Sequence, residues 1–169
     1  ATGLLLPQRA DAAIQQTFER KKGKISYRID LPSEAFQESQ KPVKTHLDEV
    51  NLLNPEVKGY QYGITVDPVR IQSLKEFGTP EEVAARVVTA EVNRDGIFEV
   101  TLLEDPYQST DGAYVLHYIS VGKRGNKQFF NKIIISDQQL YVLTAQCKEA
   151  DFGNLKEEMK STVSSFTVA

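Results

Sequence analysis

Three apolar-rich runs follow one another closely in the last third of the chain. They cover residues 114–121, 128–136 and 140–146, with short turns at 122–126 and 137–139. Such runs predict β-strands, and strands joined by tight turns pair side by side in antiparallel order. The end of the chain therefore predicts an antiparallel sheet.

Two other segments carry a helical pattern. Thr79 suits an N-cap, Pro80 the first helical position and Glu82 the third position of a capping box. A helix is therefore predicted to begin there and to end at Asp95-Gly96. A second, amphipathic helix is predicted from about residue 152. Its apolar stripe, which we interpret as core packing, consists of Phe152, Leu155, Met159 and Val163.

Alternating or apolar positions predict further strands at 25–29, 47–53, 60–66 and 97–103. The order is therefore strands, helix, four strands and helix. An antiparallel sheet with helices packed against it accommodates this order. The predicted fold class is α+β, with a central antiparallel sheet flanked by helices.

Composition narrows the class of protein. The chain has 169 residues, of which 40% are hydrophobic and 25% charged, and this fits one soluble globular domain, predicted at 25–169. The net charge of −3 gives no basic surplus for bulk nucleic-acid binding. No apolar run approaches the roughly 20 residues that cross a bilayer. We expect a monomer in solution.

Residues 1–24 are predicted to form a flexible arm. Residues 13–24 are polar and end in a basic run. Ala10-Asp11-Ala12 has the small-x-small form of a signal-peptidase site, and Leu4–Leu6 is apolar. One interpretation is that residues 1–12 are the end of a targeting peptide. The other is a flexible terminus that contains alanines by chance.

Candidate catalytic residues are few. A nucleophile needs a base beside it, and the chain has two histidines and no glycine-flanked serine elbow. The single cysteine, Cys147, is interpreted as a partly buried thiol, and it excludes a multi-thiolate zinc site. His117 either lines a polar face of the sheet or acts as a ligand or pH-sensitive group. No residue pattern supports an enzyme.

Metal and phosphate sites have little support. His46, Asp48 and Glu49 are suitable ligand types for a divalent cation, but they lack the spaced oxygen ligands of a calcium loop. We therefore favour solvated loop charge, and we interpret the acidic loop at 104–111 in the same way. A P-loop and a dinucleotide fingerprint are both missing from the sequence.

Two basic clusters are candidate contacts for a partner. One lies at the end of the predicted arm, and the other at the turn that follows residue 121. Together the two clusters could engage an acidic partner and speed encounter, and a role in solubility explains them at least as well. The residues are Arg20, Lys21, Lys22, Lys24, Lys123, Arg124 and Lys127.

Several segments together resemble the PsbP family in order and spacing. Residues 73–83 are similar to the phenylalanine-glycine-serine/threonine-proline-glutamate-glutamate opening of the family's long helix. The other matching segments are the strands at 25–32, 111–114 and 140–146 and the closing serine-phenylalanine at 165–166. The resemblance runs from about residue 24 to residue 169.

The resemblance implies an α-β-α sandwich in the chloroplast thylakoid lumen, without catalytic activity and peripheral to the membrane. The founding member is an extrinsic subunit of photosystem II that helps the oxygen-evolving centre retain calcium and chloride, so calcium is the cofactor that the resemblance allows. Relatives act in assembly or maintenance of photosystem I, photosystem II or the chloroplast NADH dehydrogenase-like complex. The implied partner is photosystem II or another thylakoid membrane complex. A lumenal destination also favours the cleavage interpretation of residues 10–12.

The chain departs from the founding member at several positions. It has no Trp, and Phe152 stands where the family's last helix often opens with one. Lys127-Gln128 stands where the founding member has a histidine before the glutamine, so a metal role of that histidine does not transfer. Residues 33–58 do not align. These differences favour a diverged lumenal relative, an assembly factor among the options, over the oxygen-evolving subunit itself.

Two alternative hypotheses come from other classes of protein. The first is a small lumenal enzyme or ion-binding protein that uses His117 or Cys147. The second is a soluble regulator that shares only its fold with the Ran-binding nuclear import factor, and this predicts a nuclear or cytosolic location.

Overall fold

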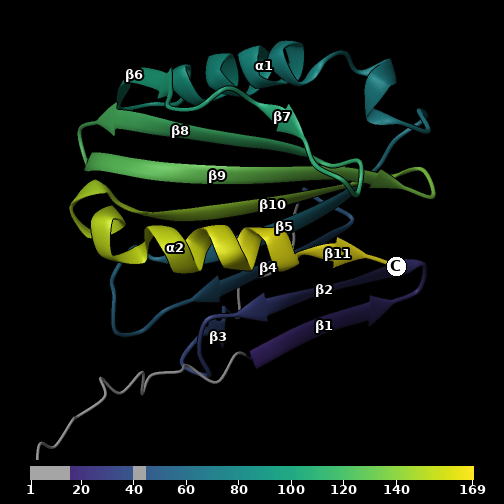
Figure 1. The fold of residues 1–169 in the computed structure, drawn as a ribbon, viewed down its shortest axis with the longest axis horizontal. Coiled ribbons are helices and arrows are strands. Elements are labelled where there is room, and N and C mark those ends of the chain that lie inside the picture. The colour runs from purple at the N-terminus through teal and green to yellow at the C-terminus, as the bar shows by residue number, and fades with distance from the viewer. Residues whose placement is uncertain (1–15, 40–44) are drawn as a thin grey trace, which may run out of the picture.

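A computed structural model describes residues 16–39 and 45–169 as two antiparallel sheets with two α-helices (Figure 1). The larger sheet has eight strands and the smaller one has three. The prediction of an α+β fold with a central antiparallel sheet flanked by helices is confirmed.

The centre of the large sheet comes from the last third of the chain, as predicted. β8 (Tyr114–Gly122), β9 (Gly125–Ser136) and β10 (Gln139–Lys148) pair in succession. The first turn is tighter than predicted and consists of Lys123-Arg124 alone. In the second turn, Asp137 and Gln138 take φ values of 51° and 59°, which suits the twist of a two-residue hairpin.

The remaining strands extend this sheet on both sides. They are β3 (Gln37–Glu38), β4 (Asp48–Leu53), β5 (Gln61–Pro68), β6 (Ile97–Leu102) and β7 (Tyr107–Gln108). The strand order is β3-β4-β5-β10-β9-β8-β6, with β7 also paired to β8. β3 and β7 are not among the strands predicted from the sequence, because a two-residue strand is too short to show alternation.

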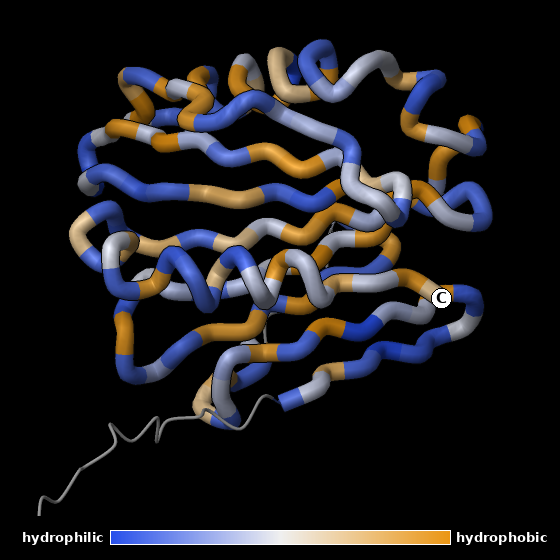
Figure 2. The backbone as a smooth tube through the Cα atoms, in the orientation of Figure 1, coloured by the Kyte–Doolittle hydropathy of each residue, from blue (hydrophilic) through white to orange (hydrophobic). Residues whose placement is uncertain are grey.

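The small sheet shows that the prediction of a flexible arm is wrong for residues 16–22. β1 (Gln16–Lys22) pairs along its length with β2 (Ile25–Leu31), and β11 (Thr167–Val168) pairs with the other side of β2. β1 is mostly exposed and predominantly hydrophilic (Figure 2). Its polarity is that of an edge strand, which is held by backbone pairing and by Phe18 against the core.

The domain therefore begins before residue 25, within the residues that the structure describes. The targeting-peptide interpretation concerns residues 1–12, which lie outside the described residues.

Both predicted helices are present. α1 (Pro80–Val92) begins with the predicted capping box, in which Glu82 N donates to Thr79 Oγ1 at 3.2 Å and Thr79 N donates to Glu82 Oε1 at 3.1 Å. α2 (Glu149–Ser165) begins three residues before the predicted start, with Lys148 at its N-cap. A short 3-10 helix, η1 (Leu74–Glu76), precedes α1. Within the described residues, neither α-helix is long and apolar enough to cross a membrane.

The two helices cover opposite faces of the large sheet. α1 packs against β6 and β8, whereas α2 packs against β9, β10 and the small sheet. Consecutive strand residues point to opposite faces, so Phe129 and Val142 belong to the core below α1, while Phe130 and Leu143 belong to the core below α2. The molecule is therefore a sandwich with α1 on one side and α2 with the small sheet on the other.

Candidate functional site

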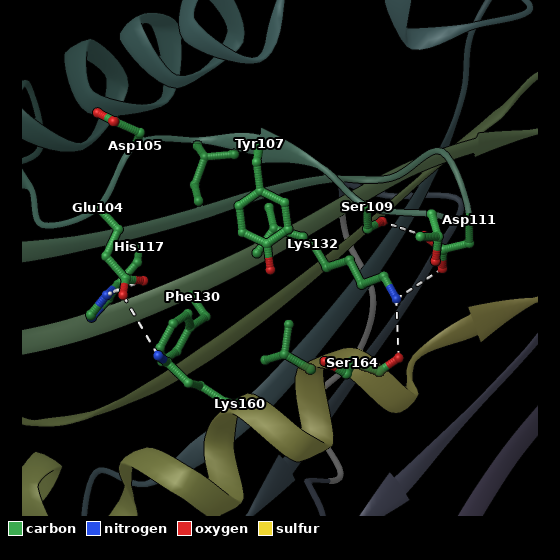
Figure 3. A pocket seen from close by; sticks show the side chains of 14 residues that line it. Glu104, Asp105, Tyr107, Ser109, Asp111, His117, Phe130, Lys132, Lys160 and Ser164 are labelled. Atoms are coloured by element: carbon green, nitrogen blue, oxygen red, sulfur yellow. Dashed lines mark hydrogen bonds and ion pairs between the residues drawn. The ribbon is translucent and has the colours of Figure 1, made fainter.

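A cavity of about 520 Å³ lies where α2 crosses the large sheet. Its floor is formed by β8 and β9, and α2 forms one wall (Figure 3). The other wall is the connection from β6 to β8, residues 103–113, which we call the strap. Its polar lining residues include Glu104, Ser109, Asp111, His117, Lys132, Lys160 and Ser164.

His117 lies on the floor of this cavity in a cluster with two phenyl rings. Its imidazole stacks on Phe130, with ring centroids 4.2 Å apart, and on Phe152 at 5.3 Å. The Nδ1 atom donates to Glu104 Oε2 at 3.1 Å, and Nε2 lies 2.8 Å from Gln128 Oε1. The ring is therefore packed against aromatic side chains, and both of its nitrogens have protein partners. Of the two interpretations of His117, the geometry favours a packed group of the sheet over a ligand.

Lys132 is the buried cation at the other end of the cavity, with 4% of its side chain exposed. Its Nζ atom donates to the carbonyl oxygens of Ser164 at 3.2 Å and Phe166 at 2.8 Å, and it lies 3.0 Å from Asp111 Oδ2. The last carbonyls of a helix lack intrahelical donors. Lys132 therefore supplies donors to the C-terminal end of α2 and fastens the strap to it.

Two acidic residues hold the ends of the strap. Glu104 bonds to His117 and lies 3.6 Å from Lys160 Nζ, while Asp111 accepts from Ser109 and pairs with Lys132. Partial burial by itself would raise the pKa of both carboxyl groups. The hydrogen bonds and neighbouring cations outweigh burial and lower the pKa of Glu104 and of Asp111. These two side chains are still 47% and 39% exposed, as expected for solvated loop charge, and they are in addition paired with His117 and Lys132.

These contacts fit a structural role better than a catalytic one. Ser109 donates to Asp111, and a carboxylate with a lowered pKa is a poor base for activating a hydroxyl group. Within residues 16–39 and 45–169, no group of three His, Cys, Asp or Glu side chains is placed to hold a metal ion. What the network does is fix the strap and α2 on the sheet.

Cys147 is fully buried on β10, opposite Gln128 of β9. Burial raises the pKa of its thiol to about 12, with a smaller contribution from Asp151. A thiol with such a pKa holds very little thiolate near neutral pH. The geometry supports a buried cysteine rather than a catalytic thiol.

The ligand candidates near residue 48 do not converge on one point. Asp48 is fully buried and accepts two hydrogen bonds from Arg20, at 3.1 and 2.8 Å. His46 instead pairs with Asp67, with Nδ1 2.8 Å from Oδ2. Glu49 follows Asp48 on β4 and therefore points to the opposite face. These groups join β1, β4 and β5 and do not surround a cation site.

The two basic clusters lie at opposite ends of the molecule. Figure 1 shows the β1–β2 turn at the right and the β8–β9 turn at the left. Arg20 and Lys22 are also paired with Asp48, at 2.8 and 3.6 Å. The predicted clusters therefore cannot form one continuous surface. Lys123 and Arg124 are exposed at the tip of their hairpin.

A second hollow of about 450 Å³, which we call the α1 groove, lies on the opposite face of the sheet. Its apolar lining comes from Val83, Val87 and Ala90 of α1 and from Ile133, Leu140 and Val142 of β9 and β10. Arg86 and Arg94 also border it.

Lys132 and Lys160 were not predicted as site residues. The signal for Lys132 is its place in the otherwise mostly apolar run 129–135, because lysine is rarely buried without partners. No comparable signal marks Lys160, since its partner Glu104 is distant in sequence and is brought close only by the strap.

Comparison with known proteins gives a family match over most of the chain. The PsbP family model matches residues 16–168. PsbP domain-containing protein 2, chloroplastic, from Arabidopsis thaliana is 31% identical over 84 residues. The aligned segment covers 48% of this chain and 36% of that relative, so the chain spans little more than a third of the relative's length.

Two solved structures share the architecture. The solution structure of cyanobacterial PsbP (CyanoP) from Synechocystis sp. PCC 6803 has a TM-score of 0.74 at 14% identity and covers 99% of this chain and 98% of its own. The Ran-binding protein Mog1p of Saccharomyces cerevisiae has a TM-score of 0.60 at 13% identity, with coverage of 92% and 96%. At such identities, the likeness establishes the fold alone. Because the family model spans nearly all the described residues, the chain belongs to the PsbP family.

Proposed function

We propose that the chain is a non-catalytic protein of the chloroplast thylakoid lumen that binds a photosynthetic membrane complex. The complex would be photosystem II or a complex undergoing assembly or maintenance. The observation that carries the proposal is the family match over residues 16–168. The chloroplastic relative in Arabidopsis thaliana supports the compartment. The proposal ranks above a Ran-binding-like regulator, for which the only support is a shared fold.

The described geometry is consistent with binding. The polar residues of the cavity beside α2 are engaged with one another, whereas Lys123 and Arg124 project at the tip of the β8–β9 hairpin. An exposed basic tip of this kind suits an acidic surface on the partner and steers encounter. A role in calcium or chloride retention, as in the founding member, would then be exerted within the assembled complex.

The proposal is tested by following the tagged chain in thylakoid membranes. We expect it to co-migrate with a photosynthetic complex on native gels. The double variant Lys123→Glu with Arg124→Glu should reduce co-migration, because it reverses the charge of the hairpin tip. A matched control, Lys58→Glu with Lys75→Glu, makes the same change of charge at exposed residues outside both basic clusters and should leave co-migration unchanged.

Two results would count against the proposal. Recovery of the chain only as a free monomer would exclude its stable association with a complex. Accumulation in the nucleus or cytosol would favour the Ran-binding-like regulator. The enzyme alternative is tested separately by His117→Ala and Cys147→Ser, and retention of any measured activity by both variants would end it.

A further inference from the structure

α1 covers only part of its face of the large sheet. A helix is about 10 Å wide and strands lie about 4.8 Å apart, so one helix covers roughly two strands. α1 lies over β6 and β8 at the edge of the sheet. No second α-helix among the described residues packs on this face, and Leu140 and Val142 of β10 are only half-buried. The α1 groove lies between α1 and the part of this sheet face that no α-helix of the described residues covers, and its lining is mostly apolar.

We propose that the α1 groove binds an amphipathic helix of a partner protein, with apolar side chains in the groove and acidic residues facing Arg86 and Arg94. This inference goes beyond the proposed role in photosynthesis, because it concerns another surface and does not depend on the compartment.

The topology determines the form of the occupant. The strands that line the groove, β8, β9 and β10, are each paired on both sides. They therefore offer no free backbone edge to an extended segment, whose own N–H and C=O groups would remain unpaired on an apolar floor. A helix satisfies its backbone internally. Packed beside α1 at the usual 8–10 Å between axes, it would continue the helical layer across the sheet.

The charges determine the chemistry of the occupant. The side chains that β8, β9 and β10 contribute to the groove are uncharged, and α1 with the residues directly after it contributes Arg86, Glu91 and Arg94. Glu91 is nearly buried and pairs with Arg94 at 3.1 Å. Arg86 is exposed and takes part in none of the ion pairs formed within residues 16–39 and 45–169. The border of the groove therefore carries a net positive charge.

The spacing of the arginines gives the pattern of the partner. Arg86 and Arg94 are eight residues apart, and Arg94 lies two residues beyond the end of α1, so their separation along the helix axis is at most about 12 Å. A partner helix that carries two acidic residues about two turns apart on one flank matches this separation. Its apolar residues would recur at three- and four-residue spacing on the adjacent face.

The test uses a synthetic helical peptide on the purified chain. The peptide has leucines on one face and two glutamates two turns apart on the flank of that face. Nuclear magnetic resonance titration locates the contact, and the same titration gives the affinity. We expect shifts at Val87, Ala90, Leu140 and Val142. A second peptide with lysines in place of the glutamates should bind more weakly.

A charge swap separates this groove from non-specific apolar binding. The variant Arg86→Glu should bind the glutamate peptide about tenfold more weakly and should bind the lysine peptide better than the native chain does. Arg86 is exposed, so the variant should unfold at the same temperature as the native chain. Lys21→Glu, at the far end of the molecule, is the matched control and should leave both affinities unchanged.

Three outcomes would overturn the inference. They are shifts that map outside the groove, equal affinity of the glutamate and lysine peptides, and equal binding by a proline-interrupted peptide or by dodecanoate. The last outcome would indicate a site for extended peptides or acyl chains. None of these results depends on thylakoid membranes, so failure here is distinguishable from failure of the proposed function.

Discussion

The cavity beside α2 and the α1 groove are similar in size, at about 520 and 450 Å³, but they differ in how their polar groups are satisfied. In the cavity, Glu104 pairs with His117 and Asp111 pairs with Lys132. Lys132 also donates a hydrogen bond to the carbonyl oxygen of Phe166. In the groove, the walls are mostly apolar and Arg86 stands outside the ion pairs of the described residues. The pairing of the charged side chains, rather than the volume of the hollow, therefore indicates which hollow stabilises the fold and which one is suited to a partner.

This difference has an energetic consequence. Lys132 is buried, so its removal leaves the carbonyl oxygens at the end of α2 without their donor, which lowers the free energy of unfolding. Half-exposed apolar walls contribute less to folding, because much of their surface is still in contact with water. Substitutions in the cavity should therefore affect stability, whereas substitutions in the groove should affect mainly binding.

The largest effect is expected for Lys132→Ala. It removes the donor to two carbonyl oxygens at the end of α2 and the partner of Asp111. We expect a loss of about 2–4 kcal/mol in the free energy of unfolding, measured by urea denaturation, because two buried hydrogen bonds and the packing of the side chain are lost. Lys160→Ala is the control, since that residue is 40% exposed, and should cost at most about 1 kcal/mol. Equal effects would show that the buried network is not the main stabiliser of the cavity.

The next effect is expected for His117→Ala. The change removes a ring that packs against Phe130 and Phe152, and it leaves Gln128 without its partner. A loss of about 2–3 kcal/mol in the free energy of unfolding should follow. His46→Ala is the comparison. The side chains of His46 and its partner Asp67 are each about one-third exposed, so the free energy of unfolding should fall by only about 0.5 kcal/mol. A loss below that of His46→Ala would contradict the structural role of His117.

A pair of identical substitutions compares the two hollows directly. Val163→Ala acts on a buried residue of α2 that lines the cavity, and Val87→Ala acts on a half-buried residue of α1 that lines the groove. We expect losses of about 2 kcal/mol and about 0.5 kcal/mol, in that order. The comparison would fail if Val87→Ala were as destabilising as Val163→Ala, since the groove would then be part of the core.

The smallest effect is expected for the stability that Asp111 of the strap contributes, and for its dependence on pH. The pKa of Asp111 is lowered in the folded state from its ordinary value of 3.8. The stability that its charge contributes is therefore present above pH 3.8 and is lost as the pH falls through the lower folded value. Asp111→Asn should be less stable than the native chain at neutral pH, and the difference should shrink in strong acid. A difference that stays constant between these conditions would exclude this contribution from the carboxylate.

Some elements could be predicted from sequence because their causes are local. The start of α1 depends on Thr79, Pro80 and Glu82, which are neighbours in the chain. The hairpins of β8, β9 and β10 depend on short turns between apolar runs. Such features need no knowledge of distant residues.

Other elements could not be predicted because distant contacts decide them. β1 is polar enough to have been interpreted as a flexible arm, and its pairing with β2 and the bond from Arg20 to Asp48 decide otherwise. The acidic loop was interpreted as solvated charge, and its pairing with His117 and Lys132 became visible only in the fold. The sequence does not place the two basic clusters relative to one another, and the fold puts them at opposite ends of the molecule.

The sequence by itself determined the fold class, the family resemblance and the shortage of catalytic residues in this chain. These depend on residue type, periodicity and order along the chain. Only the tertiary structure decided which charges are paired, which face of the sheet is left uncovered, and where the α1 groove lies. The physical reason is that pairing and exposure depend on distances between residues that are far apart in the chain, and these distances are set by how the sheet, the strap and the helices pack.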